Sequence, residues 1–143
     1  YEEVLKTSDI LTFHVPKTAE TEHMLNRSQF EYIQRGVILI NTSRGSVVKE
    51  ADLVEALENG WVKMAGLDVF EKEPLSRESK LLKMQQVILT PHIGANTEEA
   101  FYKASSLAAQ KLIYFLTDGS TSDTLPPRVP WYGATPFKSE NHA

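Results

Sequence analysis

The sequence contains no cysteine. This absence excludes a disulfide framework, a metal site built on thiolates and a cysteine nucleophile. It is also typical of proteins from a reducing compartment, and we expect a cytoplasmic protein. No apolar run approaches the roughly 20 residues of a membrane-spanning helix, and no segment has the pattern of a signal peptide. We therefore expect no membrane partner.

The chain also lacks a dense cluster of basic residues. Its 15 Lys and Arg against 19 Asp and Glu give a formal net charge of −4, which argues against binding to nucleic acid. A length of 143 residues suits one ordinary domain, and 41% hydrophobic residues are enough for a core. The sequence begins at Tyr1, without an initiator methionine and inside a predicted helix, so we expect it to be part of a longer polypeptide.

Short apolar runs rich in β-branched residues alternate with helical patterns. Because their hydrophobicity is nearly continuous, the runs predict buried parallel strands. Glycines that tolerate the end of a helix follow both intervening helical patterns. The alternation predicts an α/β fold with a doubly wound parallel sheet, whose ligands bind outside the carboxyl ends of the strands. The predicted strands are Ile10 to Val15, Val37 to Ile40, Met64 to Val69 and Val87 to Leu89, and the predicted helices run from Asn26 or Ser28 to Ile33 and from Lys49 to Asn59.

The C-terminal third has a different character. Apolar positions at helical spacing predict a long helix from Thr97 to Leu116, capped by Asn96 or Thr97. After Gly119 the sequence is rich in proline, which predicts a tail that docks through Trp131, Tyr132 and Phe137. We therefore divide the chain into residues 1–96 as a domain, 97–117 as a long helix and 118–143 as the tail.

A polar loop follows each of the last three predicted strands, and the loops contain Arg44, Glu71 and Glu73, and His92. Arginine suits bidentate recognition of a carboxylate or phosphate, and histidine suits proton transfer near neutral pH when a carboxylate orients it. Taken singly, each side chain could be a solvated charge or a loop contact. Because parallel strand ends share one edge of a sheet, their combination favours a catalytic site. Gly45 and Gly94 would let a ligand approach the backbone.

The other histidines lie in different settings. His14 ends the first predicted strand and either lines a ligand pocket or has a structural role, whereas His23 and His142 are expected to be solvated. No pair of histidines has the spacing of a metal site on a helix, so we predict no metal. No nucleophile elbow of the G-x-S-x-G type occurs.

Three stretches carry a resemblance to a known family. They are Gly36 to Gly45, Ala65 to Pro74 and Leu89 to Gly94, and their order and spacing resemble those of the NAD-dependent D-2-hydroxyacid dehydrogenases, which include phosphoglycerate, glycerate and D-lactate dehydrogenases. The resemblance extends from about Ser8 to about Leu116. It implies a Rossmann-type fold and hydride transfer between NAD and a D-2-hydroxy acid or its 2-oxo acid, with phosphoglycerate the leading substrate.

The resemblance also implies roles for individual residues. Arg44 would bind the substrate carboxylate and polarise the C2 oxygen, His92 would be the acid and base, and Glu73 would pair with His92. Glu71 is the competing carboxylate, and Glu73 is preferred because it precedes Pro74, as in the family motif. Asp68 would meet the nicotinamide side of the cofactor. The residues that would contact NAD are His14, Val15, Pro16, Thr42, Ser43, Arg44, Asp68, His92, Ile93, Gly94 and Ala95.

The family's phosphate-binding G-x-G-x-x-G turn does not occur in this sequence and would precede Tyr1. By resemblance the chain therefore holds the C-terminal half of the dinucleotide-binding domain, and its tail would return to the substrate domain. We expect it to be inactive alone and to form a homo-oligomer, most simply a dimer, through an exposed sheet edge. Two alternatives remain open: an NAD-sensing binding module without catalysis, and a truncated, non-catalytic remnant.

Overall fold

The computed structural model describes residues 1–119, which belong to two compact units. The first unit is Tyr1–Gly94, and the second begins at Ala95. The predicted tail, with its aromatic residues and His142, lies outside the described residues, and the predicted division of the chain into domains stays a prediction. Within residues 1–119, no helix is long and apolar enough to cross a membrane.

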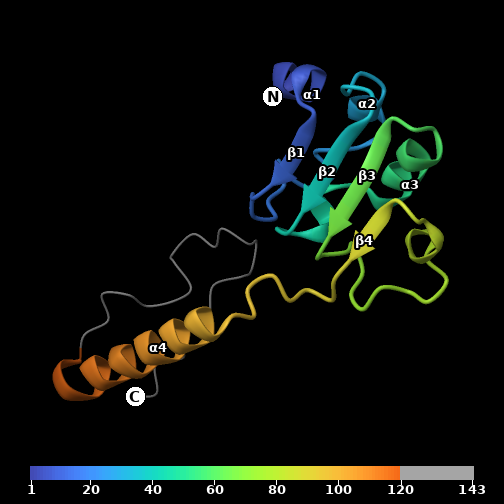
Figure 1. The fold of residues 1–143 in the computed structure, drawn as a ribbon. Helices are drawn as coiled ribbons and strands as arrows, with labels where there is room; N and C mark the ends of the chain where they lie inside the picture. Colours follow the sequence, from blue (N-terminus) through green and yellow to red (C-terminus); the bar gives the residue numbers. More distant parts are fainter. Residues whose placement is uncertain (120–143) are drawn as a thin grey trace, which may run out of the picture. The chain divides into compact units, whose positions relative to one another are not determined.

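The first unit is built on a parallel sheet, as predicted. Its strands pair in the order β1-β2-β3-β4 and all point the same way (Figure 1). Three strands differ from their predicted ranges. β1 stops at Phe13 rather than Val15, opposite the last residue of β2, which extends one residue past the predicted Ile40 to Asn41. β3 begins at Val62 rather than Met64 and stops at Leu67 rather than Val69, before Asp68, whose side chain turns to another loop. The strands are β1 (Ile10–Phe13), β2 (Val37–Asn41), β3 (Val62–Leu67) and β4 (Val87–Leu89).

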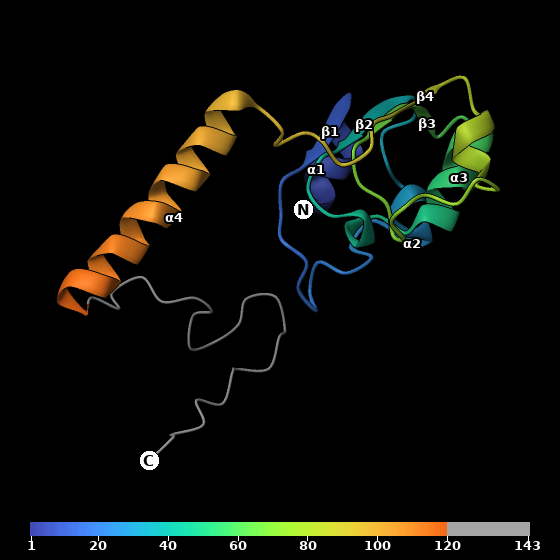
Figure 2. The same ribbon diagram turned by 90° about the horizontal axis from the view of Figure 1, so that it is seen from below.

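Three helices cover one face of this sheet: α1 (Glu2–Thr7), α2 (Arg27–Phe30) and α3 (Glu50–Glu58) (Figure 2). Alternate strand residues such as Leu11 and Leu39 point into the core. There they pack with apolar helix residues such as Phe30 and Leu53. This alternation places the core between the sheet and the helices. Single turns of 3-10 helix, Gly45–Val47 and Lys80–Lys83, lie in two of the connections.

Helix ends follow the capping residues of the sequence. The Asn26 side chain accepts a hydrogen bond from the Ser28 N–H at 3.0 Å, so α2 begins where predicted. It ends at Phe30, three residues before the predicted Ile33. Helix α3 ends at Glu58 and is followed by Gly60, whose φ of 70° is the left-handed conformation expected after a helix.

The second face of the sheet differs from the prediction of strands buried on both sides. Ile10 is 57% exposed and Ile88 is 63% exposed, and Ile40 and Met64 on the same face are also exposed. The physical reason is that, among the residues described in the first unit, the helices pack on the opposite face. Continuous hydrophobicity therefore predicted the strands, but only one face of them is covered in this unit.

The second unit contains one described helix, α4 (Glu98–Asp118). It begins at the predicted cap, because the Thr97 hydroxyl accepts from the Ala100 N–H at 3.1 Å. It extends two residues beyond the predicted Leu116, to Asp118, and the next residue, Gly119, caps it with a φ of 70°. Apolar side chains such as Phe101, Leu112 and Phe115 are exposed along it.

Candidate active site

The candidate active site lies where β2, β3 and β4 end. Because these strands are parallel, their carboxyl ends share one edge of the sheet (Figure 1). The loops that follow begin at Thr42, Asp68 and Thr90. Ligands of open parallel sheets bind at this edge. The topology thus brings the three polar loops of the sequence together.

A buried asparagine holds the arginine loop. Asn41 is 1% exposed. Its Oδ1 accepts from the N–H and the hydroxyl of Ser43 at 3.1 and 2.9 Å, and its Nδ2 donates to the Arg44 carbonyl at 3.0 Å. The backbone of Arg44 is therefore fixed, while its guanidinium is exposed and donates to the Ser43 carbonyl at 2.6 Å. Sequence reasoning missed Asn41 as a site residue, although its position on the buried side of β2, after Val37 and Leu39, was a usable signal.

The arginine loop contacts the glutamate loop directly at Gly45. A Cβ atom on Gly45 would lie 1.9 Å from the carbonyl carbon of Phe70 and 2.5 Å from the Glu71 nitrogen. Such distances are impossible for a side chain, so only glycine allows the two backbones to approach this closely. Gly45 thus admits a neighbouring loop, and the approach of a ligand to its backbone stays a prediction.

His92 and Glu73 form a hydrogen-bonded pair. The distance from His92 Nδ1 to Glu73 Oε2 is 2.8 Å, and Glu73 Oε1 accepts from the Phe70 N–H at 3.1 Å. The hydrogen bond with His92 holds the pKa of the Glu73 carboxyl below its usual range, and the charge of Arg44 adds to this effect. Since Nδ1 is engaged, the opposite nitrogen of the ring, Nε2, is the one that can meet a ligand.

Glu71, the competing carboxylate, binds a different histidine. Its Oε1 is hydrogen-bonded to His23 Nε2. The prediction that His23 is solvated is therefore wrong: its side chain is 40% exposed and forms an ion-pair contact. The sequence offered no signal for this pair, because its members are 48 residues apart and belong to different loops.

Asp68 organises the loop that carries His92. Its carboxylate is 5% exposed and accepts from the Thr90 hydroxyl at 2.6 Å and from the N–H groups of Ile93 and Gly94 at 2.9 and 2.8 Å. Burial raises the pKa of Asp68, but these hydrogen bonds outweigh it and hold the pKa below the usual 3.8. The loop is thereby held with His92 at a φ of 55°, which is uncommon for residues other than glycine.

Replacing Asp68 by asparagine should destabilise the first unit and change its response to acid. The amide would present N–H groups to backbone donors, and the expected loss is about 1–3 kcal/mol of unfolding free energy. Because the pKa of Asp68 is lower in the folded chain than in the unfolded one, the wild type loses this stability as the pH falls below 3.8.

Urea unfolding of the 143-residue chain between pH 3 and 7 measures both effects. The variant should show a weaker dependence of stability on pH at the acidic end. A control is Asp9→Asn, which alters an exposed aspartate before β1, outside the three loops, and should leave stability nearly unchanged. Equal stability of wild type and Asp68→Asn at pH 7 would contradict the assigned hydrogen bonds.

The remaining predicted contact residues lie at the same edge or beyond it. His14 follows β1, is exposed, and is hydrogen-bonded to Thr12 at 2.9 Å. Val15 is partly buried against the core. Ala95 opens the second unit. Pro16, Thr42 and Ile93 are exposed, and Ser43 and Gly94 take part in the contacts described above. Within residues 1–119, no group of three His, Cys, Asp or Glu side chains could hold a metal ion.

Fold and loop arrangement together define an α/β domain with a polar site at the carboxyl edge of a parallel sheet, the class to which nucleotide-binding domains belong. Residues 1–94 match the family model of the D-isomer specific 2-hydroxyacid dehydrogenase, NAD binding domain. The chain therefore belongs to the D-2-hydroxyacid dehydrogenase family, and its first unit is part of an NAD-binding domain.

Individual relatives agree with the family model. The chain is 47% identical over 115 residues to a glyoxylate reductase of Thermococcus litoralis, which covers 80% of this chain and 34% of that protein. It is 43% identical over 113 residues to a D-3-phosphoglycerate dehydrogenase of Archaeoglobus fulgidus, covering 79% of this chain and 21% of that protein. The chain thus spans about a third or less of these curated relatives.

Solved structures show the same fold. The TT0316 protein of Thermus thermophilus superposes with a TM-score of 0.77 at 39% identity, over 80% of this chain and 37% of that one. A D-lactate dehydrogenase of Aquifex aeolicus, complexed with NAD and lactic acid, superposes with a TM-score of 0.73 at 34% identity, over 80% of this chain and 39% of that one.

Proposed function

We propose that this chain supplies the catalytic residues of an NAD-dependent dehydrogenase that interconverts a small 2-hydroxy acid and its 2-oxo acid. The observation that carries the proposal is the convergence of three loops. His92 is bonded to Glu73 at 2.8 Å, and the charge of Arg44 is close enough to lower the pKa of the same carboxyl. A fixed imidazole beside a guanidinium suits proton transfer on a substrate that carries a carboxylate.

The proposed mechanism assigns one task to each side chain. Arg44 binds the substrate carboxylate with its guanidinium fork and polarises the C2 oxygen. Glu73 holds the ring of His92 through Nδ1, so that Nε2 takes the hydroxyl proton during oxidation and returns it during reduction. Asp68 accepts a hydrogen bond from the Ile93 N–H and so holds the backbone next to His92 in place. The proposal also includes a contact between Asp68 and the nicotinamide.

The residues at this edge fit the nicotinamide half of NAD. Thr42 and Ile93, in the loops after β2 and β4, are exposed and would contact the cofactor there, and Gly94 has no side chain to obstruct it. Pro16, exposed in the segment after β1, would instead line the adenosine pocket. Bound NAD would supply the hydride acceptor. The sequence has no G-x-G-x-x-G turn, so the proposal assigns no pyrophosphate contact to this chain.

Substrate choice is proposed at the level of a chemical class. The relatives reported above are named for glyoxylate and for 3-phosphoglycerate, both small acids with a carboxylate next to the reacting carbon. Arg44 fits this shared group, whereas no described residue selects between the two. Phosphoglycerate therefore stays one candidate beside glyoxylate, and the cytoplasmic location and the dimer also stay predictions.

A segment exchange tests the proposed function. The 115-residue segment of the Thermococcus litoralis glyoxylate reductase that aligns with this chain is replaced by the corresponding residues of this chain. The chimera should oxidise NADH with glyoxylate or hydroxypyruvate. Arg44→Lys should then lower kcat/KM about 10- to 100-fold, because an ammonium cannot replace a bidentate hydrogen bond that involves charged groups.

A matched control is Arg27→Lys, which alters an exposed arginine paired with Glu55 at 2.9 Å, in α2 and outside the candidate site. It should leave the rate unchanged. A folded chimera that binds NADH, measured by its fluorescence, but turns over none of a panel of 2-oxo acids would contradict the proposal and favour an NAD-sensing binding module. Equal rates for Arg44→Lys and Arg27→Lys would remove Arg44 from the mechanism.

A further inference from the structure

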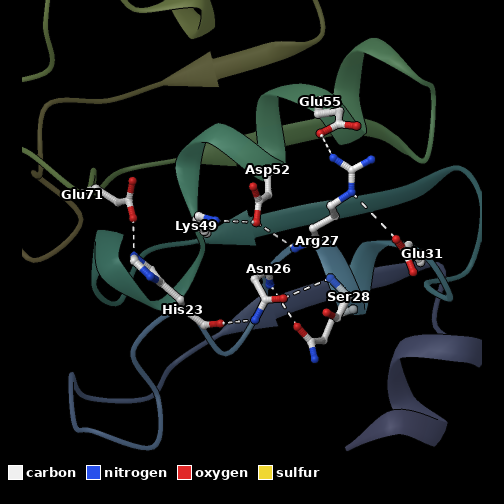
Figure 3. A network of polar contacts seen from close by, with 10 residues as sticks. His23, Asn26, Arg27, Ser28, Glu31, Lys49, Asp52, Glu55 and Glu71 are labelled. Carbon is white, nitrogen blue, oxygen red and sulfur yellow. Dashed lines mark hydrogen bonds and ion pairs between the residues drawn. The ribbon is translucent and has the colours of Figure 1, made fainter.

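His23, which the mechanism does not use, connects two loops of the candidate active site. It lies near the end of the segment between β1 and α2 (Figure 3). The backbone N–H of His23 donates to the Ser46 carbonyl at 2.7 Å, in the turn that follows Arg44. Its side chain is hydrogen-bonded to Glu71, in the loop that carries Glu73. A single residue thus contacts both the arginine loop and the glutamate loop.

The backbone of His23 is itself firmly placed. Its φ is 51°, a left-handed conformation that few residues other than glycine adopt. The His23 carbonyl accepts from Asn26 Nδ2 at 2.9 Å, in the cap of α2 (Figure 3). Two residues after His23, Leu25 is fully buried and pairs with Val48 in a parallel bridge. The imidazole therefore extends toward Glu71 from a fixed point.

The loop that carries Glu73 has few other means of support. Residues 71–74 are exposed, and among the described residues none of 70–75 makes a hydrogen bond from backbone to backbone. Glu71 is held by its side chain, through His23, and by its N–H, which donates to the Glu50 carboxylate. Glu73 lies two residues further on. Glu73 also accepts from the Phe70 N–H, and the backbone of Phe70 and Glu71 lies close to Gly45. The position of Glu73 therefore depends on the backbone at Phe70 and Glu71, and His23 is the side chain that holds Glu71.

We propose that His23 is a positioning residue that acts through Glu71 to keep Glu73 within hydrogen-bond reach of His92. The inference rests on the proposed function for its catalytic meaning, but the geometry it describes does not. The His23 and Glu71 side chains are 40% and 31% exposed, so their hydrogen bond contributes little to the free energy of unfolding. The contact instead helps to place residues 71–73, which make no hydrogen bond from backbone to backbone within the described part of the chain.

Two amide substitutions at His23 separate the effect of side-chain length, which decides whether Glu71 can be bonded, from the effect of backbone conformation. Asparagine tolerates a positive φ but is too short to bond with Glu71, whereas glutamine places its amide nitrogen near the position of the imidazole Nε2. We would follow the Glu73 carboxyl by 13C NMR titration in the full 143-residue chain. His23→Asn should raise the pKa of Glu73 toward the usual 4.5, and His23→Gln should keep it low.

The control is Glu22→Gln, which breaks an exposed ion pair with Lys17 (3.0 Å) one residue away from His23. It should leave the titration of Glu73 unchanged. Glu71→Ala removes the pair from its other end, at a position without a positive φ, and should raise the pKa as His23→Asn does. A folded His23→Asn or Glu71→Ala chain with the wild-type Glu73 titration would overturn the proposal, as would equal shifts in His23→Asn and His23→Gln.

The titration needs no turnover, so it is independent of the proposed function. In the segment-exchange chimera, His23→Asn should also lower kcat about tenfold with little change in KM, because a small displacement of a positioning group weakens catalysis more than binding. An inactive chimera would contradict the proposed dehydrogenase but leave the titration result standing. A normal titration with a reduced kcat would contradict the positioning role.

Discussion

His92→Asn should lower kcat of the segment-exchange chimera about 10²- to 10⁴-fold, with little change in KM for the 2-oxo acid. Asparagine is among the residues that accept a positive φ most readily, so the backbone of the loop, with its φ of 55° at this position, should be preserved. Its amide can still donate to Glu73, but it cannot take up and return a proton. The substitution therefore removes the acid and base and leaves the binding groups in place.

Steady-state kinetics with NADH and glyoxylate measure the loss, and the pH-rate profile identifies its cause. The profile of the variant should lack a titration limb that the wild-type chimera shows. An unchanged far-UV circular dichroism spectrum and urea-unfolding midpoint serve as the control that the variant still folds. A variant with wild-type kcat and an unaltered profile would exclude His92 as the acid and base.

The convergence of Arg44, Glu73 and His92 could be anticipated because it depends on topology. Apolar runs with short connections predict parallel strands, and the residues that directly follow parallel strands meet at one edge. The structure places Arg44 after β2, Glu73 after β3 and His92 after β4 in this way. The argument does not depend on the spacing of residues within each loop, so it holds although β3 ends two residues before its predicted end.

The contacts that hold these loops could not be anticipated, because they join segments that are distant in sequence. Asp68 bonds to the N–H groups of Ile93 and Gly94, and His23 bonds to Glu71 across 48 residues. Neither contact leaves a local pattern, since an aspartate after a strand and a histidine in a polar loop are equally compatible with solvation. Glu71 and Glu73 illustrate the limit: two carboxylates two residues apart contact different histidines.

Gly45→Ala should lower the stability of the first unit by about 3 kcal/mol or more in unfolding free energy. The added Cβ would lie 1.9 and 2.0 Å from the carbonyl carbon and oxygen of Phe70. These are backbone atoms, so no rotamer change can make room, and one loop must move away from the other. Urea unfolding of the 143-residue chain, followed by far-UV circular dichroism, measures the loss.

Gly66→Ala is the matched control, because no heavy atom lies within 4 Å of the position of its Cβ and its φ is not positive. Alanine at this point of β3 should leave stability unchanged or raise it slightly, since it restricts the unfolded chain. Comparable stability of the two variants would contradict the close approach at Gly45. Where Gly45→Ala still folds, the displaced loop should carry Arg44 away from Glu73, and because the charge of Arg44 helps to lower the pKa of Glu73, that pKa should rise. One added methyl group would then separate the arginine from the His92–Glu73 pair without changing any of the three side chains.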